Sequence, residues 1–118
     1  MANRNAPPRV SAEAFFTDDL CRLYRILDNL EETANMALHY VLRSGEWGRT
    51  AKYLEELQEY LAEERCNIVS DLRERPNTSD EDGQKRLATL IQYEAWCREF
   101  HKSTLADLIA NPLSTDAV

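Results

Sequence analysis

The sequence predicts an all-α fold, an elongated up-down-up three-helix bundle with coiled-coil-like packing. The chain of 118 residues holds only three glycines and four prolines, so residues that end helices are scarce. Leu, Ala, Glu and Arg, which favour helix, are frequent. Apolar residues recur at helical spacing in three long stretches, and no stretch shows the alternation of a strand. These observations together favour long helices joined by short turns.

The first predicted helix spans 11–44 and has the strongest pattern. Ser11 is its expected N-cap, and Gly45 is expected just past its end, where glycine is preferred. Its apolar residues keep a 4-3-4-3 spacing, which is typical of a bundle helix, and flanking apolar residues predict contact with two neighbours. The residues in this heptad pattern are Phe16, Leu20, Leu23, Leu27, Leu30, Ala34, Ala37 and Val41.

The second and third predicted helices span 47–75 and 80–110. Pro76 should end the second helix, because a residue before proline disfavours helix. Ser79, with Asp82 three residues later, predicts the start of the third helix. We expect one domain over 11–111, with flexible tails at 1–10 and 112–118.

The net charge is −7, and the negative charge is spread evenly along the body of the chain. This balance argues against direct binding to nucleic acid or to an anionic membrane. Three widely spaced cysteines, Cys21, Cys66 and Cys97, form no CxxC pair. No signal-peptide pattern and no membrane-length apolar run occur. We therefore expect reduced thiols and a cytoplasmic location.

The third helix carries polar residues on its apolar face. Glu94, Cys97 and His101 are spaced i, i+3, i+7, and all three side-chain types bind zinc. A bundle metal site usually draws on at least two helices, but the other two offer only His39 and Cys66, both off the core. No glycine-rich oxyanion loop accompanies Cys97 and His101 as a nucleophile pair. We therefore assign no catalytic residue, metal or cofactor.

The favoured interpretation of these polar residues is structural. A carboxylate buried alone would cost several kcal/mol, so Glu94 needs a partner. Arg65, which interrupts the apolar face of the second helix, and Arg98 are the candidate partners, and His101 is expected beside them. A cross-helix ion pair of this kind would fix the register of the bundle.

Aromatic residues widen the apolar sector of the helices beyond what a bundle core needs. Trp and Tyr are enriched at binding hot spots, so these residues are the candidate partner interface. The alternative is that they only cover the edge of the core. The candidate interface residues are Tyr93, Trp96 and Phe100 on the third helix and Tyr53 and Tyr60 on the second.

These features predict a non-enzymatic helical module that acts by protein–protein contact. It would act as a homodimer, or as a small subunit, adaptor or inhibitor of a larger assembly. The alternative function is an acidic nucleic-acid mimic that inhibits a DNA- or RNA-binding machine, as in mobile elements or phages. A metal-binding helical bundle is the third possibility.

Overall fold

The computed structural model describes residues 15–45 and 48–110, and within these ranges the chain is all-α. Four helices are present there: α1 (Thr17–Arg43), α2 (Arg49–Glu74), α3 (Asp80–Cys97) and α4 (Lys102–Ala110). The predicted tails, 1–10 and 112–118, lie outside the described residues. The all-helical class is confirmed, but four helices replace the predicted three.

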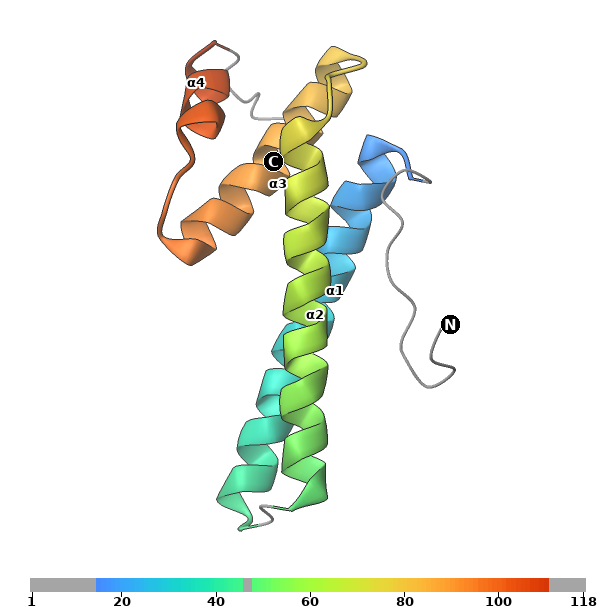
Figure 1. The fold of residues 1–118 in the computed structure, drawn as a ribbon, viewed down its shortest axis with the longest axis vertical. Helices are drawn as coiled ribbons and strands as arrows, with labels where there is room; N and C mark the ends of the chain where they lie inside the picture. Colours follow the sequence, from blue (N-terminus) through green and yellow to red (C-terminus); the bar gives the residue numbers. More distant parts are fainter. Residues whose placement is uncertain (1–14, 46–47, 111–118) are drawn as a thin grey trace, which may run out of the picture.

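Helices α1 and α2 form a long antiparallel hairpin (Figure 1). Gly45, with φ 83°, follows the end of α1 as predicted, and its N–H donates to the Leu42 carbonyl. Helix α2 ends at Glu74, because Arg75 takes an extended conformation (ψ 134°) before Pro76. The predicted start at 11 is wrong: Phe16 is the N-cap of α1, and its N–H donates to the Asp19 carboxylate.

The prediction of one continuous helix over 80–110 is also wrong. Helix α3 begins as predicted, with Ser79 accepting the N–H of Asp82, but it ends at Cys97. Arg98 adopts the left-handed conformation (φ 59°, ψ 28°), and the chain then turns back into α4. Helix α4 lies beside α3 (Figure 1).

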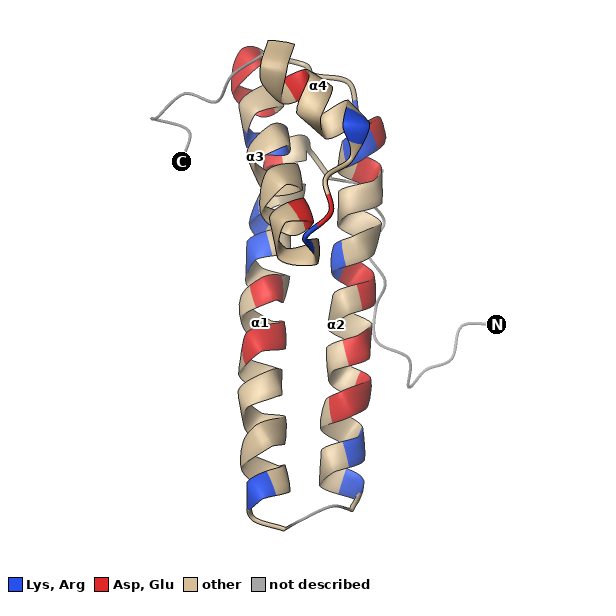
Figure 2. Cartoon of the chain, turned by 90° about the vertical axis from the view of Figure 1, so that its left-hand side faces the viewer, with Lys and Arg blue, Asp and Glu red and all other residues tan. Residues whose placement is uncertain are grey.

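Helix α3 covers only one end of the hairpin, which we call the proximal half. Figures 1 and 2 show α3 and α4 beside the ends where α1 begins and α2 ends. The rest, residues 30–43 of α1 and 49–60 of α2, is the distal half, and in the described chain it consists of two helices alone. An up-down-up bundle of three equal helices is therefore not what forms.

The packed core follows this division. The larger cluster is centred in the proximal half, where Leu20, Tyr24, Ile68, Leu72 and Leu90 are each no more than 1% exposed, and it reaches Ala34 in the distal half. The distal cluster has three buried members, Leu38, Val41 and Ala51. The number of layers thus sets the size of the core.

The heptad pattern of α1 is only half buried. Leu20, Leu27, Ala34 and Val41 are buried, whereas the alternate members Phe16, Leu23, Leu30 and Ala37 keep partial or full exposure. Helix α2 therefore covers one row of the pattern, and the other row stays at least partly exposed along the described length of α1.

Candidate functional site

Glu94 is the centre of the polar cluster in the proximal half. Its side chain is 1% exposed. One oxygen accepts the backbone N–H of His101 at 2.5 Å, and the other accepts the Thr104 hydroxyl at 2.7 Å. The Arg73 guanidinium lies 3.5 Å away. Because both accepted hydrogen bonds come from the first turn of α4, Glu94 caps that helix from α3.

The predicted partners of Glu94 are therefore wrong. Arg73, not Arg65 or Arg98, is the cation beside it. His101 contributes its backbone rather than its imidazole, and its side chain is exposed. Arg98 is exposed at the left-handed turn. The break at Arg98 moves His101 off the face of α3 that Glu94 occupies, whereas Arg65 is engaged by Asp28 and Glu31 of α1.

Arg65 is buried as predicted, but its partners lie on α1. Its guanidinium binds Asp28 at 3.0 Å and Glu31 at 2.5 Å, and it donates to the Tyr24 hydroxyl at 3.4 Å. Burial alone would lower the pKa of Arg65, but the charge of Glu31, with Tyr24 and Asp28, raises it overall. This network ties α1 to α2, and nothing in the sequence identified its acidic members.

Trp96 stacks on the outer side of Arg65. The guanidinium carbon lies 4.8 Å from the ring centroid, yet the Trp96 side chain stays 64% exposed. A hollow of about 440 Å³ opens beside this pair, and its other lining residues are Asp28, Glu31, Glu32, Asn35 and Gln58. Since Arg65 neutralises the two nearest carboxylates, the hollow is a mixed polar surface rather than a concentrated anionic site.

Tyr93 joins α3 to both helices of the hairpin. Its ring meets Tyr24 edge to face, with centroids 6.3 Å apart, and its hydroxyl lies 3.1 Å from the Cys66 sulfur. The contact with Cys66, together with burial, raises the pKa of Tyr93. Tyr93 is therefore mainly a packing residue.

The five candidate interface aromatics do not form one patch. Trp96 is exposed at the C-terminal end of α3, and Phe100 is exposed in the turn that follows. Tyr53 lies about 140° around α2 from Gln58, which lines the hollow beside Trp96. Tyr60 lies on the same side of α2 as Tyr53, seven residues along. The aromatics thus divide between the two sides of the hairpin.

The side of the hairpin turned away from α3 carries an apolar surface, which we call the hairpin face. Leu30 is 50% exposed and Tyr53 66% exposed, and Ile26 and Tyr40 are also exposed. Leu57 and Tyr60 are partly buried and pack against the core. The hairpin face comprises Ile26, Leu30, Ala37 and Tyr40 of α1 and Tyr53, Leu57 and Tyr60 of α2.

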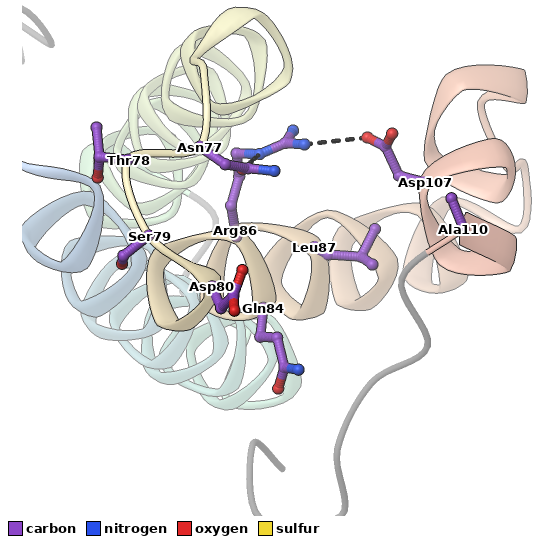
Figure 3. A pocket seen from close by; sticks show the side chains of 10 residues that line it. Asn77, Thr78, Ser79, Asp80, Gln84, Arg86, Leu87, Asp107 and Ala110 are labelled. Carbon is purple, nitrogen blue, oxygen red and sulfur yellow. Dashed lines mark hydrogen bonds and ion pairs between the residues drawn. The ribbon is translucent and has the colours of Figure 1, made fainter.

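A second hollow, of about 560 Å³, lies between the α2–α3 turn and α4 (Figure 3). Arg86 lines it and is held on three sides. It donates to Asn77 at 2.9 Å, to the Leu72 carbonyl at 3.0 Å and to Asp107 at 3.0 Å. Figure 3 shows the contact with Asp107, which connects α3 to α4. Because Arg86 is already engaged, it serves to hold the helices together.

Among the described residues, no group of three His, Cys, Asp or Glu side chains is placed to hold a metal ion. No helix in the same ranges is both long and apolar enough to cross a membrane.

Over residues 15–45 and 48–110, the fold and surface define an all-α protein in which one side of the hairpin exposes apolar residues. Comparison with models of known families, with curated proteins and with solved structures gave no match.

Proposed function

We propose that this chain is a non-enzymatic helical module of the cytoplasm that acts by protein–protein contact. The observation that supports the proposal is the hairpin face, with its half-exposed Leu30 and largely exposed Tyr53. Contiguous apolar surface of this kind on a soluble protein marks contact sites. The aromatic residues on it are of the type that dominates binding energy.

The polar clusters of the proximal half support the same proposal. Glu94 and Arg86 are engaged by backbone groups and side chains that hold helices together. Arg65 is likewise engaged by the carboxylates of α1. Each of these buried charges thus has a structural partner. Contact, rather than chemistry, is the activity that the exposed surface supports.

The test combines solution mass with binding of the dye ANS, which fluoresces on apolar surfaces. We expect the protein either to self-associate or, as a monomer, to bind the dye. In the second case, Leu30→Lys should reduce the fluorescence, whereas Glu99→Lys, an exposed position on the α3–α4 turn, should not. A monomer that binds no dye would contradict the proposal.

The acidic-mimic alternative has one observation in its favour. Figure 2 shows Asp and Glu midway along the hairpin and again at its upper end, with Lys and Arg at the lower end and between the two acidic regions. Arg65 already neutralises Asp28 and Glu31 within that region, which weakens the mimicry. Salt separates the two functions: a mimic should lose its target on moving from low to moderate ionic strength, whereas an apolar contact should change little.

A further inference from the structure

We propose that a second copy of this chain covers the hairpin face, so that two hairpins form a four-helix bundle. This inference rests on the proposed function, since it names the partner for the contact surface. It starts from α1, whose apolar pattern predicts two helical neighbours along its whole length. In the distal half of the described chain, α2 is its one helical neighbour.

The exposed row of the heptad pattern requires a helical occupant. Leu23, Leu30 and Ala37 recur every seven residues, and they alternate with the buried Leu20, Leu27 and Ala34. Residues at this spacing pack into the gaps of a facing helix that carries the same period. An extended peptide or a flat sheet would not match that period.

The dimensions of the hairpin face fit another hairpin. From Ile26 to Tyr40 the helix rises about 21 Å, and two adjacent helices are about 20 Å wide, so the face projects to about 400 Å². The accessible area of a ridged helix pair exceeds its projection. The projection alone is about half of the roughly 800 Å² that each partner contributes to a standard interface.

Self-association also satisfies the symmetry of the contact. A two-fold dimer uses the same patch on both copies, so the patch must complement itself. The distal part of the hairpin face on α1 consists of uncharged residues, namely Leu30, Ala37 and Tyr40. Its residues on α2, Tyr53, Leu57 and Tyr60, are also uncharged. Two such faces can meet without burying a charge against a charge.

The charges at the edges select how the two copies meet. The acidic residues of α1 that follow Leu20 along the chain all line the hollow on the α3 side, and they are Asp28, Glu31 and Glu32. The α1 edge of the hairpin face therefore carries no carboxylate, whereas the α2 edge carries Glu56 and, two turns earlier, Arg49. Placing α1 of one copy beside α2 of the other keeps the two Glu56 side chains apart.

The experiment measures the mass of the full chain by sedimentation equilibrium, with ANS fluorescence on the same samples. Wild type should have twice the mass of one chain at micromolar concentration. Leu30→Glu would place an unpaired carboxylate in the contact and should raise the dissociation constant by at least about 100-fold. Tyr53→Lys, at a position already 66% exposed in the single chain, should act the same way without disturbing the fold.

Ile109→Glu is the matched control, because Ile109 is an exposed aliphatic residue of α4 (82%) that lies outside the hairpin face. It should remain dimeric. Circular dichroism checks that every variant keeps its helix content.

A monomeric wild type would contradict the proposal that a second copy covers the hairpin face. If that monomer binds ANS and Leu30→Glu removes the signal, the contact proposal stands with a foreign partner; if it binds no dye, both proposals fail. A dimer that survives Leu30→Glu and Tyr53→Lys but is lost in Trp96→Ala would overturn the hairpin face as the contact, while leaving contact as the function.

Discussion

The proximal and distal halves of the hairpin share the apolar spacing of α1 but have different surroundings. In both halves α1 follows the same heptad spacing. The proximal half gains a third helix and a fourth, and Leu20, Tyr24 and Ile68 become fully buried there. The distal half has two helices within the described residues, and Leu30 is 50% exposed there. The same spacing therefore gives a larger core where α3 packs and a smaller core where it does not, while the side turned away from α3 stays exposed.

This difference shows what a heptad pattern specifies. It states that a helix side must be buried, but it does not state by what. Where α3 is present, aromatic and ionic contacts from Tyr93, Trp96 and Glu94 complete the layer. Helix α3 packs on the other side of the hairpin, so the row with Phe16, Leu23 and Leu30 remains available to another molecule. Function is thus expected in the half with less internal packing.

The largest effect should come from Glu94→Ala in the proximal half. The change leaves the His101 N–H and the Thr104 hydroxyl without their acceptor and Arg73 without its carboxylate. We expect a loss of about 4 kcal/mol in the free energy of unfolding, as for other broken buried pairs. Urea denaturation measures the loss. Hydrogen exchange should also show α4 opening before α1 and α2.

Glu99→Ala is the matched control for this prediction, because Glu99 is exposed and lies five residues further along the chain. It should change stability by less than about 0.5 kcal/mol. Equal urea midpoints for Glu94→Ala and Glu99→Ala would contradict the role of Glu94 as the cap of α4.

The next prediction compares one leucine from each half. Leu20→Ala removes a side chain that is fully buried in the proximal core and should cost about 3 kcal/mol. Leu30→Ala, at the hairpin face, should cost less than about 1 kcal/mol in dilute solution, because half of the side chain already contacts water. Equal losses in dilute urea titrations would mean that the two halves are equally packed, and the comparison would fail.

Sequence predicted the parts of this fold that depend on local signals. Gly45, Pro76 and Ser79 mark helix ends where the structure has them. The buried charge of Arg65 was predicted, since it interrupts an apolar row. Its partners Asp28 and Glu31 were not, because the pairing depends on the register between α1 and α2, which local patterns leave open.

The candidate site divides in the same way. Burial of Glu94 and exposure of Trp96 follow from their places on the helix wheel, and the structure has both. The grouping of five aromatics into one interface fails in part, because α3 lies on the opposite side of the hairpin from Tyr53. The sequence did not predict the turn at 98–101, because no glycine or proline occurs there to mark the end of a helix.

That missed turn gives the last prediction, which tests why the proximal half has its fourth helix. Arg98 holds the left-handed conformation, which costs a residue with a side chain about 1 kcal/mol relative to glycine. Arg98→Gly should therefore raise the free energy of unfolding by about that amount, and Arg98→Ala should give no such gain. If glycine instead destabilises the protein, the side chain of Arg98 contributes more than the strain of its backbone costs. The fold of α4 onto α3 would then depend on that side chain as well as on the cap that Glu94 supplies.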